Sequence, residues 1–159
     1  MLHTQRFSVS FEYPVYFGTG IFSVQNRAFL DALARREPER RHRSVFVIEQ
    51  RVAECFPHLV REIERYVEHH ADGLALVARP LVVPGGEACK NDARAPRRLA
   101  AWFDELGLDR QSFVVVVGGD GERPGDEPTQ QVVELVEGLA GISCLDEVQA
   151  VVLERNGQR

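Results

Sequence analysis

The segment SFVVVVGGDG, residues 112–121, is the most strand-like stretch of the chain and decides its fold. Its valines make it apolar on both faces, and it ends in glycines. A strand that is apolar on both faces is typical of the centre of a parallel sheet, because helices cover such a sheet on both sides. The segment therefore predicts a buried central strand in a domain of the α/β class.

The segments before this strand alternate between strand and helix patterns. SVFVIE (44–49) is a β-branched and aromatic run bounded by charge, and GLALVARPLVV (73–83) is the next strand region. Between them, HLVREIERYVEHHAD (58–72) has its apolar residues at helical spacing. DARAPRRLAAWFDELG (92–107) predicts a further helix, which ends at Gly107. This order predicts parallel strands joined by helices.

The N-terminal part continues the same alternation. FSVSFEYPVYFG (7–18) reads as a strand with a break near Pro14, and NRAFLDALARRE (26–37) predicts a short helix that starts near Asn26. We therefore expect an α/β, Rossmann-like fold of about five strands, a three-layer arrangement with a mostly parallel sheet and helices on both faces.

The character of the chain changes after Gly121. A polar, turn-rich linker is followed by TQQVVELVEGLAG (129–141), which reads as a helix capped by Thr129, and by VQAVVLE (148–154), a possible last strand. We accordingly divide the chain into a domain over 1–121 and a divergent tail over 122–159 that packs on the same domain.

Composition and charge exclude several classes of protein. The 159 residues fit one domain, and 44% hydrophobic with 27% charged residues indicates a packed core. A formal net charge of -5 gives no bulk attraction for nucleic acid or anionic membrane. The arginine-rich segment 35–43 lacks interleaved aromatic residues, which favours a solvated loop over a nucleic-acid site.

Cysteine usage and the apolar runs indicate a cytoplasmic protein. Cys55, Cys89 and Cys144 are odd in number and widely spaced, which argues against a disulfide framework or a structural zinc site and suits a reducing compartment. We see no signal peptide, and the apolar runs are too short to span a bilayer. We therefore expect no membrane partner.

Three polar or glycine-rich loops follow the predicted strands. They are IEQ (48–50), PGGEACK (84–90) and GGDG (118–121). The carboxyl ends of parallel strands meet at one edge of a sheet, and ligands of open α/β sheets bind there. The three loops therefore indicate a binding site at this edge.

Each candidate side chain in these loops has two readings. Glu49 is either a ribose contact or a solvated strand end. Glu87 and Lys90 either hold a ribose diol and a phosphate or form an incidental surface ion pair. Gly118 and Gly119 either let backbone N–H groups approach a phosphate or form a plain turn.

Other chemistry finds no support in the sequence. The adjacent His69 and His70 point to different faces of a helix, and neither they nor His58 form an HExxH pattern, so we expect no metal site. Ser112 and Ser143 lack a nucleophile-elbow motif. We therefore assign no catalytic residue.

Four segments taken together resemble the N-terminal half of the 3-dehydroquinate synthase family, the sugar phosphate cyclases. They match in order and spacing over about residues 7–119 and are YPVYFGTGIF (13–22), VFVIEQRV (45–52), VVPGGEACKND (82–92) and LDRQSFVVVVGGD (108–120). The most specific element is the family's P-x-GExxK loop, which stands here as Pro84, Gly86, Glu87 and Lys90.

The resemblance implies a Rossmann-like domain that binds NAD. It implies that Glu49 meets the adenosine ribose and that Gly118 and Gly119 approach the pyrophosphate. It also implies that Gly86, Glu87 and Lys90 lie in the loop that lines the NAD site. The family is an NAD- and metal-dependent carbon–oxygen lyase, whose divalent metal and substrate are held by a second, mostly helical domain.

The chain departs from the family at two points. The third glycine of the family's glycine run is Asp120 here, and the aspartate of that motif falls on Pro124. No counterpart of the metal- and substrate-binding domain is recognised, so we expect a domain that is not catalytic alone. Its expected partners are NAD and either a second copy or a separate catalytic half. The alternative is a stand-alone nucleotide-binding or protein-interaction module.

Overall fold

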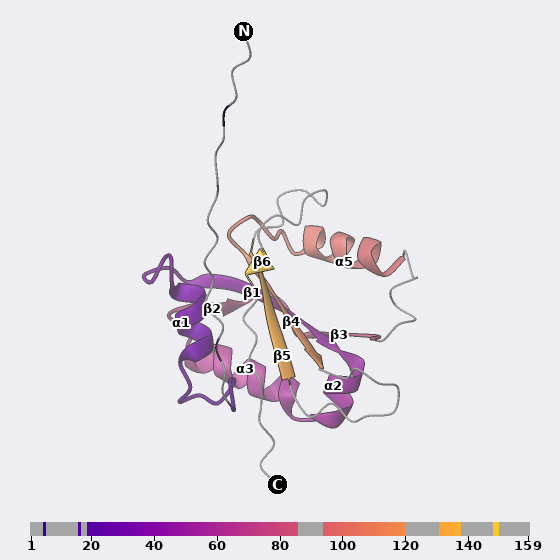
Figure 1. Ribbon diagram of the computed structural model, residues 1–159, viewed down its shortest axis with the longest axis horizontal. Helices are drawn as coiled ribbons and strands as arrows, with labels where there is room; N and C mark the ends of the chain where they lie inside the picture. Colours follow the sequence, from indigo (N-terminus) through magenta and orange to yellow (C-terminus); the bar gives the residue numbers. More distant parts are fainter. Residues whose placement is uncertain are drawn as a thin grey trace.

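The structure, a computed structural model, describes residues 5, 16, 19–85, 94–119, 131–137 and 148–149. Its helices are α1 (Ala28–Ala34), α2 (Gln50–Cys55), α3 (Leu59–His69) and α5 (Arg94–Glu105). Its strands are β1 (His42–Glu49), β2 (Leu74–Leu76), β3 (Leu81–Val83), β4 (Phe113–Gly119), β5 (Gln131–Glu137) and β6 (Val148–Gln149). They form a single open sheet in the order β2-β1-β4-β5-β6, with β3 also beside β1 (Figure 1).

Strand β1 lies at the centre of the parallel part of the sheet. On one edge it pairs first with β2, from His42 opposite Leu74, and then with β3, up to Glu49 opposite Val83. On its other edge it pairs with β4, and all three pairings are parallel. The predicted α/β class and mostly parallel sheet are therefore confirmed. The strand region expected over 73–83 is divided into β2 and β3, which occupy successive halves of one edge.

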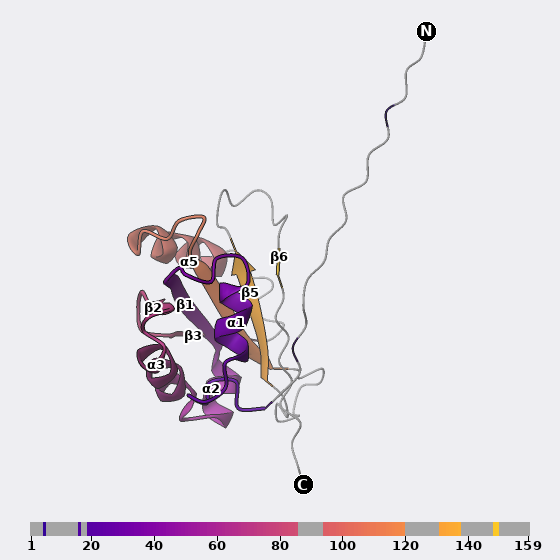
Figure 2. The same cartoon turned by 90° about the vertical axis from the view of Figure 1, so that its left-hand side faces the viewer.

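The side chains of β1 alternate between two hydrophobic clusters. Phe46 and Ile48 pack with residues of α1 and α3, whereas Val45 and Val47 pack with residues of α5. Figures 1 and 2 both show β1 lying between α3 and α5. The chain order explains this, because it passes through α3 to one edge of β1 and through α5 to the other. Crossovers of the same hand in opposite directions place their helices on opposite faces.

Four aromatic rings form the centre of the cluster under α1 and α3. Phe22, Phe29, Phe46 and Tyr66 are all buried, and their ring centroids lie 5.4 to 6.0 Å apart in edge-to-face or tilted pairs. Such geometry is favoured for aromatic pairs. The cluster joins the loop before α1 to α1, β1 and α3.

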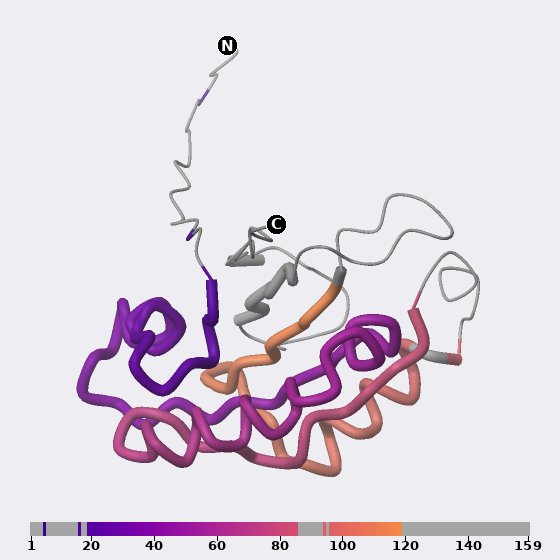
Figure 3. The backbone as a smooth tube through the Cα atoms, turned by 90° about the horizontal axis from the view of Figure 1, so that it is seen from below, coloured from indigo at the N-terminus to yellow at the C-terminus, as the bar shows by residue number. Residues whose placement is uncertain are grey.

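The hydroxyl of Tyr66 links α3 to the start of α1. It donates to the Asn26 carbonyl oxygen at 2.8 Å and accepts from the Leu30 N–H at 3.3 Å. Asn26 also fixes the preceding loop, because its side-chain amide donates to the carbonyls of Thr19 and Gly20. The predicted start of the helix near Asn26 is confirmed, and Figure 3 shows this loop and α1, in indigo, at one side of the fold.

One predicted element is wrong. The helix expected over 129–141 is replaced at Gln131–Glu137 by β5, which pairs antiparallel with all of β4, from Phe113 opposite Glu137 to Gly119 opposite Gln131. Its apolar residues, at positions 132, 133, 135 and 136, fit helical spacing better than strand alternation. Three of them are β-branched valines, however, and the otherwise open edge of β4 offers a full set of hydrogen bonds.

The remaining expectations near the termini have mixed outcomes. The strand expected over 7–18 lies outside the described residues, apart from Tyr16, which packs against the core under α1 and α3. The possible last strand over 148–154 appears as β6 at Val148–Gln149, antiparallel to β5. The short helix α2, directly after β1, was not predicted.

Arginines of the segment 35–43 are tied into the fold. Arg40 forms an ion pair with Glu37 at 2.9 Å, and Arg41 donates to the Leu74 carbonyl oxygen at 3.0 Å. Arg43 donates to two carbonyls at the end of α5. Residues 35–39 and 41 are exposed, as expected for a solvated loop, whereas His42 and Arg43 already belong to β1. Over the described part of the chain, no helix is both long enough and apolar enough to cross a membrane.

Candidate functional site

The carboxyl ends of three parallel strands meet where the sequence predicted a site. Ile48 of β1 pairs with Val117 of β4. Glu49 follows Ile48 and Gly118 follows Val117, so each lies one residue beyond this pair. Neighbouring strands lie about 4.8 Å apart, so these two residues are side by side. On the other edge of β1, Glu49 pairs with Val83, the last residue of β3. The structure therefore brings Glu49 and Gly118 together.

The connections make this edge a switch point of the sheet. The chain leaves β1 through α2 and α3 toward the edge that carries β2 and β3. It leaves β4 in the opposite direction, toward β5. Loops that diverge from adjacent strands open a crevice between them, and this is where ligands of open α/β sheets bind. Glu49 and Gly118 lie at the two sides of this position.

Glu49 extends toward the loop that follows β3. It is half-buried and stands at the N-cap position of α2, but its side chain makes no capping hydrogen bond there. Its side chain instead lies against the backbone of Gly85, where an added Cβ would overlap its Oε1 and Cγ atoms and come within 2.5 Å of its Cδ. The carboxylate is therefore held beside the start of the PGGEACK loop.

Gly118 occupies a position where glycine is not required by its described neighbours. Its φ angle is not positive, since Gly20 and Gly107 are the described glycines with that geometry. A Cβ placed on Gly118 meets no heavy atom of the described residues within 4 Å. As far as the described residues go, the space beside Gly118 is therefore open toward a close-approaching group.

Of the other predicted site residues, one lies at the same edge and three lie outside the described part of the chain. Gly119 is the last residue of β4 and lies at the same edge as Gly118. Gly86, Glu87 and Lys90 lie outside the described residues, so their expected positions stay predictions. Sequence reasoning did not single out Gly85, although its place in a glycine pair two residues after the end of β3 was a signal of close backbone approach.

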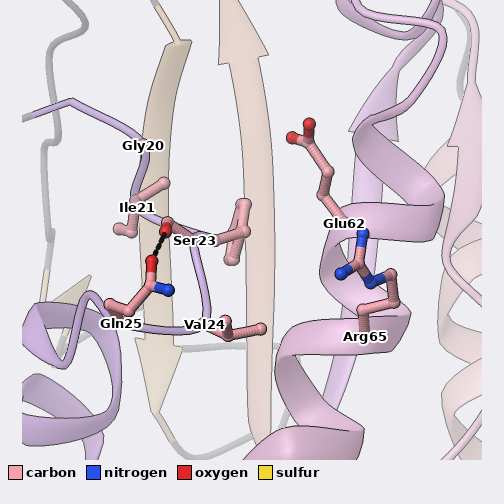
Figure 4. Close-up of a pocket in the computed structure, with 8 residues that line it drawn as sticks. Gly20, Ile21, Ser23, Val24, Gln25, Glu62 and Arg65 are labelled. Atoms are coloured by element: carbon pink, nitrogen blue, oxygen red, sulfur yellow. Dashed lines mark hydrogen bonds between the residues drawn. The ribbon is translucent and has the colours of Figure 1, made fainter.

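A separate hollow of about 360 Å³ lies between the loop before α1 and helix α3 (Figure 4). Ile21 and Phe22 of the loop are buried and line it, together with exposed side chains such as Ser23, whose hydroxyl donates to Gln25 at 3.2 Å. Its other side is formed by two exposed charged residues of α3, Glu62 and Arg65. None of these residues belongs to the Glu49 edge. The sequence did not predict the hollow, because loop and helix meet only in the folded chain.

The three histidines considered as metal ligands lie at the ends of α3: His58 at its N-cap, His69 as its last residue and His70 at its C-cap. The Nδ1 atom of His58 accepts from Arg61 at 2.6 Å, and the rings of His69 and His70 stack edge to face at 4.8 Å. The Nε2–H of His70 donates to the Val24 carbonyl oxygen, and burial, followed by the neighbouring His69, lowers the His70 pKa. Within the described ranges, no three histidine, cysteine, aspartate or glutamate side chains are grouped to hold a metal ion.

Ser112, which carried no nucleophile motif, belongs to the turn that leads into β4. Its buried hydroxyl donates to the Asp109 carboxylate at 2.8 Å and accepts from the Asp109 N–H at 3.2 Å. The hydrogen bond from Ser112, followed by one from the Gln111 N–H, lowers the pKa of Asp109. This turn lies at the opposite end of β4 from Gly118, so it takes no part in the candidate site.

Comparison with known proteins does not identify a family for the chain. No family model matches it, and no curated protein or solved structure is significantly similar to it. The likeness to the 3-dehydroquinate synthase family rests on the four segments alone and stays a prediction.

Proposed function

We propose that the chain is an NAD-binding domain of the 3-dehydroquinate synthase type, with a three-layer, Rossmann-like architecture. The observation that carries the proposal is the juxtaposition of Glu49 and Gly118 at the switch point between β1 and β4. The resemblance assigned these same residues, from separate motifs, to the adenosine ribose and the pyrophosphate. Their register in a parallel sheet supports a single ligand that spans both strand ends.

The two positions offer complementary chemistry for an adenine dinucleotide. The Glu49 carboxylate is an acceptor for the two hydroxyls of a ribose, and such charge-assisted hydrogen bonds are stronger than neutral ones. Gly118 leaves room for a phosphate to approach the backbone. By resemblance, Gly86, Glu87 and Lys90 complete the site. Bound NAD would supply transient hydride acceptance, whereas the chain itself binds and orients the cofactor.

Catalysis is not part of the proposed role of this domain alone. The chemistry of the family also needs a divalent metal and a substrate pocket, and the motifs recognised in this chain include neither. We place the domain as the cofactor-binding half of a cyclase, whose metal- and substrate-binding half is not among the motifs recognised in this sequence.

Calorimetric titration with NAD tests the proposal. We expect saturable binding, which Glu49→Gln weakens roughly 10- to 100-fold, because hydrogen bonds to a charged group contribute about 1.5 to 3 kcal/mol. Glu62→Gln, a carboxylate change in the hollow beside α3, is the matched control and should leave the affinity unchanged. Absence of binding at millimolar NAD would overturn the proposal.

A further variant distinguishes the two places where a nucleotide could lie. Arg65 is the cation of the hollow beside α3, and arginine is a frequent phosphate ligand. Arg65→Ala should not change the affinity for NAD if the cofactor lies at the Glu49 edge. If Arg65→Ala weakens binding and Glu49→Gln does not, the nucleotide occupies the hollow and the assignment is wrong.

The alternative, a protein-interaction module, is favoured by one observation at the edge of the sheet. Val82 of β3 is 42% exposed, and no other large hydrophobic residue of the described part is exposed. No further strand lies beyond β2 and β3 among the described residues, so this edge has the geometry for pairing with a second strand. Light scattering over a concentration series tests it, since a monomer at every concentration argues against a second copy at this edge.

A further inference from the structure

We propose that Gly85 is a positioning residue that holds the Glu49 carboxylate at the carboxyl edge of the sheet. The inference rests on the proposed function in one respect: the ribose of NAD is taken as the ligand of Glu49. Glu49 pairs with Val83 at the end of β3, and two residues later the chain passes beneath the Glu49 side chain at Gly85. The carboxylate therefore lies on the backbone of the loop that carries the P-x-GExxK motif.

Steric contact with Glu49 accounts for the glycine at position 85. A Cβ there would overlap the Oε1 and Cγ atoms of Glu49 and lie 2.5 Å from its Cδ, a separation that real Cβ atoms essentially never show. The backbone conformation does not require glycine, since the described glycines with positive φ are Gly20 and Gly107. Among the described residues, the Glu49 side chain is thus the reason for a residue without Cβ.

The overlap with Cγ decides what a larger residue would do. If only the carboxylate oxygens met the new Cβ, a small rotation at the end of the side chain would remove the clash. Because Cγ also overlaps, the whole side chain beyond its Cβ has to turn to another rotamer. The carboxylate then leaves its position against the Gly85 backbone, although Glu49 itself is unchanged. Gly85 therefore controls the position of the proposed ribose acceptor through its contact with Glu49.

A double-mutant cycle on thermal stability tests the contact without any ligand. Gly85→Ala in the wild-type chain should lower the melting temperature by about 2 to 4 °C or more, the shift expected for a loss of about 1 kcal/mol in a chain of this size. In the Glu49→Ala background the clash is gone, and the same change should be neutral or stabilising, since alanine restricts the unfolded chain more than glycine. Equal losses in both backgrounds would overturn the inference.

Titration with NAD then tests positioning. Gly85→Ala should weaken binding roughly 10- to 100-fold, as much as Glu49→Gln does, and the double variant should lose no more than either. Gly73→Ala is the matched control: an added Cβ there meets the Leu30 side chain at 2.9 Å, away from the carboxyl edge. It should affect stability and leave the affinity for NAD unchanged.

The two experiments separate the possible failures. If the wild-type chain does not bind NAD, the proposed function fails, while the stability cycle still decides whether Gly85 positions Glu49. If Glu49→Gln weakens binding and Gly85→Ala does not, the proposed function stands and the positioning role is wrong.

Discussion

The two faces of the sheet are built differently although the same strands supply both. Under α1 and α3, β1 contributes the large side chains Phe46 and Ile48 to a cluster whose central rings are wholly or almost wholly buried. Under α5, β1 contributes Val45 and Val47, and the helix covers them with half-buried residues such as Trp102. Because burial of apolar area drives folding, the face under α1 and α3 should supply more of the stability.

The residues that stabilise the fold are also distinct from the residues of the candidate site. Glu49 and Gly118 lie at the edge where β1 and β4 end, and neither residue belongs to either cluster. A rigid core beneath a sparsely packed edge is the usual arrangement for a site that must admit a ligand. Substitutions in the cores should therefore change stability, and substitutions at the edge should change binding.

Matched phenylalanines on the two faces give the largest expected effect. Phe29 of α1 is fully buried, whereas Phe103 of α5 is partly exposed. Phe29→Ala should lower the free energy of unfolding by about 3 to 5 kcal/mol, the range for a buried phenylalanine, and Phe103→Ala by roughly half of that or less. Urea unfolding measures both values. Equal losses would contradict the proposed difference between the faces.

The Tyr66 hydroxyl tests the stability of the face under α1 and α3 at a single polar group. Tyr66→Phe leaves the Asn26 carbonyl and the buried Leu30 N–H without this partner, so it should cost about 1 to 3 kcal/mol in urea unfolding. Burial raises the pKa of Tyr66 to about 12 from an ordinary value of 10.0. The unfolded chain therefore ionises first, and the contribution of Tyr66 to stability, complete below pH 10, is lost as the pH rises toward 12.

The phenylalanine variant is also the control for this alkaline effect. It lacks the ionisable hydroxyl, so its stability should fall less steeply than that of the wild-type chain between pH 10 and pH 12. Identical slopes for the two chains would show that Tyr66 is not the group responsible.

The smallest effect is expected on the α5 side. Arg43 donates to the Leu106 carbonyl at 3.2 Å and the Gly107 carbonyl at 3.0 Å, and so satisfies acceptors at the end of α5. Arg43→Ala should cost about 0.5 to 1.5 kcal/mol in urea unfolding. Arg110→Ala, an exposed change near the same helix end, should stay within about 0.5 kcal/mol of the wild-type chain. A loss for Arg43→Ala as large as that for Phe29→Ala would break the comparison.

Elements with strong local signals could be predicted from the sequence. Helix α3 carries a complete apolar stripe, and α5 ends before Gly107, whose φ of 57° is the left-handed conformation that glycine adopts readily. β1 and β4 are apolar runs bounded by charge or glycine. In each case, the local pattern and the tertiary environment favour the same structure.

The sequence-based predictions were wrong or incomplete where tertiary contacts, and not local patterns, determine the structure. Residues 131–137 have their apolar residues at helical spacing, and pairing with β4 nevertheless selects the strand. The six residues of α2 are too few to show a period. At the candidate site, the alternation of strands and helices predicted that the loops carrying Glu49 and Gly118 would lie at one edge of the sheet. The contact of Glu49 with Gly85 depends on one rotamer against one stretch of backbone, which no periodicity encodes.

The position of β1 has a consequence for synthesis of the chain on the ribosome. β1 ends at Glu49, but its inner partner β4 begins only at Phe113. Pairing distant segments requires closure of a long loop, which slows folding relative to local contacts. The growing chain therefore carries one uncovered edge of β1 until β4 has emerged, and this interval is when the nascent chain most needs protection from aggregation.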